Sequence, residues 1–235
     1  MKTKKSPFRQ LRMYYHRLQN TTCLRIDGVR IGTSENGLSR SIRSQIFKGV
    51  YEQPERRLVQ EYLRPGDRVL EIGCGIGLVS LVATRVCGEG NVFSYEANPV
   101  MEETIRSNYR LNGWQPNLFM KAITADGRRL RFFRQQNVLS SSLIDRDMGG
   151  EEIEVESVAI NDAIAAHRPT AVVMDVEGAE EEILPVADLS GVRVLILELH
   201  PHIIGEEKVN GLVKGLEEQG FALREKSHKT WCLER

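Results

Sequence analysis

The fold is decided by the stretch Arg68-Val-Leu-Glu71-Ile-Gly73-Cys74-Gly75-Ile-Gly77. An apolar run reaches a carboxylate and then three glycines at alternate positions, and an apolar helical pattern follows over residues 78–84. This order predicts a strand, a tight turn and a helix. The glycines allow positive φ and let a ligand approach the backbone, while the helix N-terminus directs free N–H groups at that ligand.

The spacing of the glycines indicates which ligand the turn could take. A dinucleotide-binding turn has the pattern G-x-G-x-x-G, whereas this turn has G-x-G-x-G followed by Leu78. Glu71 stands two residues before the first glycine, where its charge would repel a pyrophosphate but suit a cationic ligand. The pattern therefore disfavours NAD. The alternative is a glycine-rich turn that binds nothing.

The composition limits the class of protein. At 235 residues, the chain fits one larger domain, or a domain with a short extension. Lys plus Arg and Asp plus Glu number 32 each, so no net charge attracts a nucleic acid, and we expect no nucleic-acid partner. The scattered cysteines predict reduced thiols in a cytoplasmic protein. The basic first residues precede no apolar segment, so we expect neither a signal peptide nor a membrane span.

The first 50 residues are predicted to be an N-terminal extension, and residues 51–235 the main domain. The extension should hold a helix within residues 1–20 and a β-hairpin over residues 23–31, because Asp27-Gly28 interrupts an alternating apolar pattern. A helix is predicted next, over residues 54–63.

Beyond this point, strand and helix patterns alternate. Repeated strand–helix–strand units imply parallel pairing with right-handed crossovers, and hence an α/β, doubly wound, mostly parallel sheet with helices on both faces. The predicted strands are 68–72, 91–96, 118–123, 171–175, 192–200, 221–224 and 230–234, with a hairpin-like pair at 130–133 and 152–158.

Several segments together resemble the FkbM family of class I S-adenosylmethionine-dependent methyltransferases, over roughly residues 45–200. The resemblance is carried by Gly49-Val-Tyr51-Glu52, the glycine turn, Tyr95-Glu96-Ala97-Asn98-Pro99, Ser141-Ser142-Leu143 and above all Asp175-Val-Glu177-Gly178-Ala179-Glu180. It implies a seven-stranded Rossmann-like methyltransferase sheet, S-adenosyl-L-methionine (SAM) as cofactor, and methyl transfer to a hydroxyl oxygen of a small acceptor such as a sugar or secondary metabolite.

The chain departs from the family pattern at the glycine turn. Glu71 stands where the family often has Asp, and Cys74 and Gly75 stand where it often has a small residue and Asn. Asn161 likewise replaces an Asp. The changes at the turn keep charge and backbone room, so we expect cofactor binding to survive.

The cofactor site is expected where the strands end. Glu96 ends the second strand about 20 residues after the glycine turn, the spacing at which an acidic side chain meets ribose hydroxyls in such folds. The alternative is a solvated glutamate that caps the next helix. The cofactor-binding residues are expected to be Tyr51, Glu52, Glu71, Gly73, Cys74, Gly75, Gly77, Glu96, Ala97, Asn98, Ala122, Ile123 and Asp175.

A hydroxyl acceptor must lose its proton, and the candidate bases are Asp175, Glu177 and His200. Asp175 could instead fix only the amino group of the cofactor, and His200 could be a structural hydrogen-bonding residue. The acceptor is expected to contact Ser141, Ser142, Glu177 and His200.

We expect no metal. Asp175, Glu177 and Glu198 should converge at one edge of the sheet, but the Asp-Asn pair of metal-dependent catechol methyltransferases is missing.

Three alternative functions stay open: N-methylation, modification of RNA, and a cofactor-binding scaffold without turnover. RNA modification would need a basic face, of which the composition gives no sign. The expected partner is a small hydroxylated molecule, and a homo-oligomer is possible.

Overall fold

The computed structural model describes residues 6–34, 38–134 and 151–235. A seven-stranded sheet forms its centre, in the order β12-β13-β11-β10-β3-β4-β5. The five strands from β11 to β5 run parallel, and β13 runs antiparallel to both its neighbours. The strands are β3 (Val69–Ile72), β4 (Val92–Tyr95), β5 (Asn117–Phe119), β10 (Ala171–Asp175), β11 (Val194–Glu198), β12 (Ala222–Ser227) and β13 (Thr230–Glu234).

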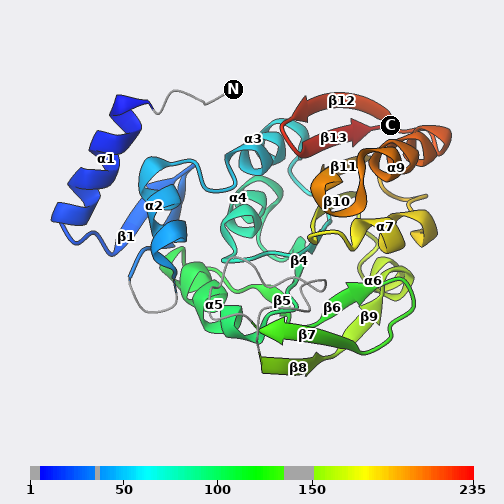
Figure 1. Ribbon diagram of the computed structural model, residues 1–235, viewed down its shortest axis with the longest axis horizontal. Helices are drawn as coiled ribbons and strands as arrows, with labels where there is room; N and C mark the ends of the chain where they lie inside the picture. Colours follow the sequence, from blue (N-terminus) through cyan, green and yellow to red (C-terminus); the bar gives the residue numbers. More distant parts are fainter. Residues whose placement is uncertain (1–5, 35–37, 135–150) are drawn as a thin grey trace.

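Helices cover both faces of this sheet (Figure 1). Alternate residues of a strand point to opposite faces, so Val173 joins one buried cluster while Val172 and Met174 join the other. One face is covered by α3 (Gln53–Tyr62), α4 (Leu78–Cys87) and α5 (Glu102–Leu111), which follows the 3-10 turn Pro99–Met101. The other is covered by α6 (Ile160–His167), α7 (Glu180–Ile183) with the 3-10 turn Leu184–Val186, α8 (Pro201–Ile204) and α9 (Glu206–Glu218). The predicted α/β fold is confirmed.

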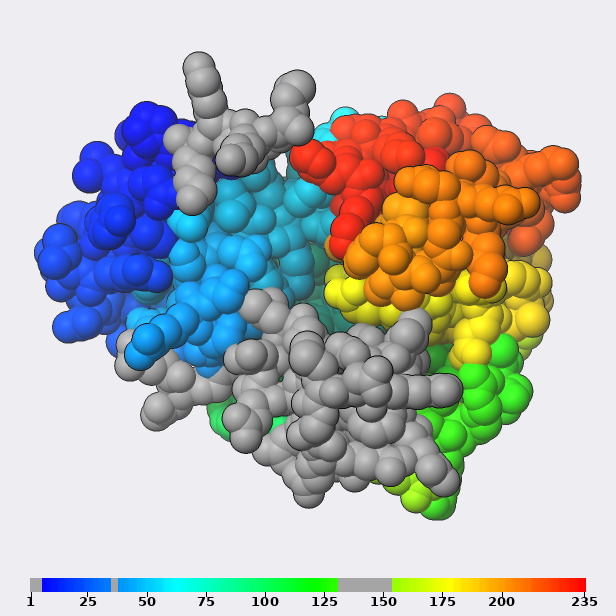
Figure 2. Space-filling model, viewed as in Figure 1, coloured from blue at the N-terminus to red at the C-terminus, as the bar shows by residue number. Residues whose placement is uncertain are grey.

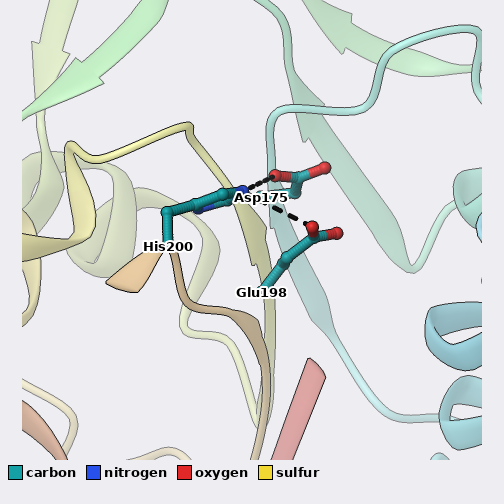
Figure 3. A group of neighbouring side chains, drawn as sticks. All are labelled: Asp175, Glu198 and His200. Atoms are coloured by element: carbon teal, nitrogen blue, oxygen red, sulfur yellow. Dashed lines mark ion pairs between the residues drawn. The ribbon is translucent and has the colours of Figure 1, made fainter. Parts of the chain in front are cut away.

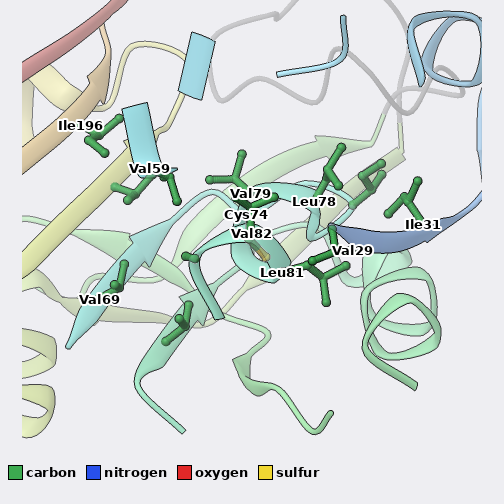
Figure 4. Packing of buried hydrophobic residues seen from close by; sticks show 14 of the residues in the cluster. Val29, Ile31, Val59, Val69, Cys74, Leu78, Val79, Leu81, Val82 and Ile196 are labelled. Carbon is green, nitrogen blue, oxygen red and sulfur yellow. The ribbon is translucent and has the colours of Figure 1, made fainter. Parts of the chain in front are cut away.

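The N-terminal extension packs beside α4 and α5. It consists of α1 (Pro7–Leu18), the antiparallel hairpin β1 (Cys23–Ile26) and β2 (Val29–Gly32), and α2 (Arg40–Lys48). Asp27 and Gly28 both have positive φ, as the two-residue turn of a hairpin requires. Val29 and Ile31 of β2 lie in the same buried cluster as Leu78 and Leu81 of α4 (Figure 4).

The strand predicted over residues 118–123 is wrong in one respect, because it is two strands. The chain turns after Phe119, whose carbonyl oxygen accepts hydrogen bonds from the N–H groups of Glu96 and Lys121. Strand β6 (Ala122–Thr124) then leaves the central sheet and pairs in parallel with β9 (Ser157–Ala159). The hairpin predicted after it is confirmed as β7 (Leu130–Arg134) with β8 (Glu151–Val155). The second strand predicted there, over residues 152–158, is also two strands, because its end belongs to β9, which pairs with β6.

None of the helices in the described residues is long and apolar enough to cross a lipid bilayer.

Candidate active site

A cavity of about 670 Å³ opens at the carboxyl ends of the central strands. Its walls come from the ends of β3, β4, β10 and β11, the start of α3, and the turn between β12 and β13. In Figure 2 the surface is hollowed between the light-blue segment of α2 and α3 and the yellow-to-red C-terminal third. This is the edge at which ligands bind in open α/β sheets.

The glycine turn brings two strand ends together. Gly73 has φ +81°, and a Cβ there would lie 1.9 Å from the carbonyl oxygen of Asp175. Gly75 has φ +52°, and a Cβ there would lie 3.3 Å from the Tyr51 hydroxyl and 3.4 Å from Glu52 Oε1. At position 73, any side chain would collide with the end of β10, so only glycine fits there. At position 75, glycine keeps the cavity wall free of a side chain.

Glu96 joins the turn to the next loop. Its Oε2 accepts a hydrogen bond from the N–H of Gly75 at 2.8 Å, and its Oε1 accepts one from the N–H of Asn98 at 2.8 Å. Burial raises the pKa of this carboxyl, against the opposing effect of these hydrogen bonds. The backbone N–H groups of Cys74 and Ala97 also favour the charged form of Glu96, and its side chain lines the cavity.

Tyr51 and Glu52 form the wall above the glycine turn. Glu52 has φ +46° and stands immediately before α3. Burial raises the pKa of both side chains well above their ordinary values; the charge of Glu52 adds to the effect on Tyr51. Glu52 Oε2 is buried without a hydrogen-bond partner and is available to a ligand.

Most of the predicted cofactor-binding residues do line the cavity. Of these, the lining includes Tyr51, Glu52, Gly73, Gly75, Glu96, Ala97, Asn98, Ala122, Ile123 and Asp175. Glu177, predicted as a candidate base and acceptor contact, lines the cavity as well. Glu71, Cys74, Gly77 and His200 lie behind this lining. Ser141 and Ser142 fall within residues 135–150, outside the described residues.

Glu71 is turned into the protein. Its Oε2 accepts hydrogen bonds from the hydroxyls of Ser80 and Ser94, each at 2.5 Å. Burial raises the pKa of Glu71 to about 7, although the two serine hydrogen bonds act in the opposite direction. This side chain therefore supports the turn from behind.

Acidic side chains gather at the end of the cavity away from Glu96. Asp175 and Glu198 are register partners at the ends of β10 and β11, and Glu177 follows on a loop at φ +46°. Glu55, in the first turn of α3, accepts a hydrogen bond from Thr230 of β13. Burial raises the pKa of Asp175 well above its ordinary value, and the charge of Glu198 adds to this.

Sequence reasoning missed Glu55, Lys229 and Thr230 as lining residues. Glu198 was considered only as part of an acidic cluster, although its place at a strand end is the same signal that identified Asp175.

His200 lies fully buried behind these carboxylates. Its Nδ1 is 3.2 Å from Glu180 Oε1, and its Nε2 faces Asp175, Glu177 and Glu198. Burial opposes the charged imidazolium, but the contacts with Glu180 and Glu198 outweigh it and raise the pKa of His200 to about 10. At neutral pH the ring therefore already holds both protons and is not poised to accept another, which disfavours the hypothesis that His200 is the base.

The sheet order and the glycine turn define the chain as a class I SAM-dependent methyltransferase. Residues 71–223 match the methyltransferase FkbM domain, and this protein belongs to that family.

More distant comparisons agree with the fold. A methyltransferase from Pyrococcus furiosus is similar over 97% of this chain and 98% of its own, with 15% identity and a TM-score of 0.50. A ribosomal protein L11 methyltransferase from Burkholderia thailandensis is 37% identical over 68 residues, which are 27% of this chain and 22% of that protein. The chain thus spans about a fifth of the length of the curated relatives it matches.

Proposed function

We propose that this protein transfers the methyl group of SAM to a hydroxyl oxygen of a small acceptor. The observation that carries the proposal is the distribution of carboxylates in one cavity, with Glu96 beside the glycine turn and Asp175, Glu177 and Glu198 at the other end. The acidic lining suits the cationic sulfonium and amino groups of SAM, and it would repel the phosphates of RNA.

The residues present fit the cofactor. The cavity volume lies within the range of about 300–1,000 Å³ that small-molecule and cofactor sites have. Gly75 leaves an open wall, and Glu52 Oε2 is a buried acceptor without a partner. When bound, SAM supplies a methyl group on a sulfonium for in-line displacement.

The residues of this chain then act by position and by proton transfer. Glu96 accepts hydrogen bonds from the ribose hydroxyls, and Asp175 fixes the ligands at the other end. Glu177 has a half-exposed carboxylate that lines the cavity. We assign Glu177 the role of the base that accepts the proton of the acceptor hydroxyl. Such a base contributes about 10²- to 10⁴-fold to a rate, while fixing the acceptor near the methyl group supplies several kcal/mol more.

A second candidate is N-methylation. An acidic acceptor end also suits an ammonium group, and the relative from Burkholderia thailandensis is named for a protein substrate. Incubation of the protein with isotope-labelled SAM and separate small-molecule, protein and RNA fractions, followed by mass spectrometry, distinguishes the acceptors. Label on oxygen in the small-molecule fraction supports the proposal. Label confined to nitrogen, protein or RNA would overturn it.

Cofactor binding is tested separately with Glu96→Ala. Because this change removes an acceptor that faces the cavity, we expect SAM affinity measured by calorimetry to fall roughly 10- to 100-fold. Glu103→Ala is the matched control, since Glu103 is an exposed glutamate on α5. Thermal unfolding of both variants checks that they fold. Unchanged affinity in a folded Glu96→Ala protein would contradict the assigned role.

A further inference from the structure

Two buried polar atoms without a hydrogen-bond partner meet at the acidic end of the cavity. In the described residues, three buried side-chain atoms lack such a partner, and Asp175 Oδ1 and His200 Nε2 are two of them. The two atoms face each other at 3.6 Å, too far for a direct hydrogen bond. A buried polar group without a hydrogen bond is costly, and a ligand between these two atoms would satisfy both.

Glu198 completes a group of three. Asp175 and Glu198 are paired residues on adjacent parallel strands, and His200 follows two residues after Glu198, so all three side chains reach the same place (Figure 3). One ligand atom from each lies within 4.8 Å of the others.

The distances between these groups are those of ion pairs, but they are longer than direct hydrogen bonds. His200 Nε2 is 3.6 Å from Asp175 Oδ1 and 3.4 Å from Glu198 Oε1. A direct charge-assisted N–H···O⁻ hydrogen bond is about 2.7–2.9 Å long. Two atoms bound to one ion at about 2.0–2.2 Å in tetrahedral geometry lie roughly 3.3–3.6 Å apart. The spacings of 3.4 and 3.6 Å around Nε2 match the separation of two ligands of one tetrahedral ion.

Glu180 orients the imidazole ring for such a role. Its Oε1 accepts hydrogen bonds from the backbone N–H of His200 at 2.8 Å and lies 3.2 Å from Nδ1, and its Oε2 accepts one from the N–H of Gly178 at 2.7 Å. Histidine ligands of metals almost always donate their second ring N–H to a carboxylate, a carbonyl or water. Glu180 supplies that contact and leaves Nε2 directed at Asp175 and Glu198.

We propose that Asp175, Glu198 and His200 bind one divalent cation of the Zn²⁺ or Mn²⁺ type at the acceptor end of the cavity. The ion replaces the proton on His200 Nε2, and this proton is released to solvent. Two carboxylates with one imidazole suit these ions better than Ca²⁺ or Mg²⁺, which prefer oxygen ligands. Because Asp175 and Glu198 line the cavity, the ion keeps an open position toward it. The next step rests on the proposed function. The open position of the ion takes the acceptor oxygen, and Glu177 stays free to accept the proton of the acceptor hydroxyl.

Metal binding is tested on the full chain after treatment with a chelator. Mn²⁺ is titrated with electron paramagnetic resonance of the free ion as the readout, and Zn²⁺ by calorimetry, both without SAM. We expect one ion per chain and a raised melting temperature. Asp175→Asn and Glu198→Gln should each lower the affinity roughly 10-fold or more.

Glu177→Gln is the matched control. Glu177 Oε2 also lies 3.4 Å from His200 Nε2, but Glu177 is outside the group of three. Its variant should keep the affinity within about threefold, well short of the loss expected for a ligand. Circular dichroism checks the fold of every variant. The proposal is overturned if neither ion binds, or if Glu177→Gln loses as much affinity as Glu198→Gln.

A SAM titration of the same metal-free protein separates the two proposals. SAM binding without metal uptake removes only the metal site. Metal uptake without SAM binding overturns only the proposed methyl transfer from SAM.

Discussion

Gly73 is the residue on which the geometry of the site depends most directly. Gly73→Ala would place a Cβ 1.9 Å from the backbone oxygen of Asp175, at a φ of +81°. The left-handed backbone costs alanine about 1–2 kcal/mol, and overpacking against backbone adds about 1–3 kcal/mol. We therefore expect the free energy of unfolding, measured in urea, to fall by about 2–5 kcal/mol.

Gly66→Ala separates backbone strain from the clash. Gly66 has a similar φ of +86°, but a Cβ there meets nothing within 4 Å. Its variant should lose only the strain contribution, about 1–2 kcal/mol. Equal losses in the two alanine variants would show that the approach of Asp175 to Gly73 adds nothing.

The sequence predicts single residues well where their position on a strand decides their environment. Glu96, just past the end of β4, and Asp175, the last residue of β10, both line the cavity as the strand-end argument requires. Glu71 does not, because it lies one residue before the end of β3 and in register with Ser94, on the face toward α4. A period of two residues decides the face, and the motif alone does not reveal which face carries the cavity.

At the scale of elements, Glu71 ties β3 to α4 and β4 through Ser80 and Ser94. Its pKa in the folded protein is about 7, above the value of about 4.3 for an unfolded chain. The contribution of protonated Glu71 to stability is therefore complete below about pH 4.3 and is lost as the pH rises to about 7, by on the order of 3 kcal/mol.

Glu71→Gln should remove this pH dependence, because glutamine does not titrate. The measurement is the free energy of unfolding in urea between pH 4.5 and 8, for the variant and the parent protein. As the pH rises, the free energy of unfolding of the variant should increase relative to that of the parent protein. The control is Glu103→Gln, which alters an exposed glutamate and should leave the slope as in the parent. Parallel curves for Glu71→Gln and the parent would rule out titration of Glu71.

Element types were predictable from the sequence, but one strand pairing and one helix–strand contact were not. The run over residues 118–123 is apolar except for Lys121, yet it divides because β9 offers β6 an edge outside the central sheet. The acidic residue Glu55 reaches the cavity because α3 begins beside β13, where Thr230 donates to it. Both depend on contacts between segments far apart in the chain, which local pattern and propensity do not encode.

At the scale of the whole molecule, the N-terminal extension has two parts that differ in how much they contribute to the hydrophobic core. Helix α1 buries Met13 and exposes Phe8, Leu11, Tyr14, Tyr15 and Leu18. The hairpin and α2 instead contribute Val29, Ile31, Ile42 and Ile46 to the cluster that includes α4 and the central sheet. One hydrophobic core thus runs across the predicted boundary at residue 50.

Two truncated chains test this difference. Removal of residues 1–19 takes away α1. Because α1 buries only one large apolar side chain, the free energy of unfolding should fall by about 1–3 kcal/mol. Removal of residues 1–50 takes away four fully buried aliphatic side chains, each worth about 1.5–3 kcal/mol, and strips the cover from α4 and α5. That loss is comparable to the entire stability of a domain, about 5–15 kcal/mol, so the shorter chain should not unfold cooperatively. Thermal and urea unfolding followed by circular dichroism distinguish the two. If the chain that begins at residue 51 unfolded cooperatively, with a free energy close to that of the chain that begins at residue 20, the extension would be an appendage and the core would end at α4.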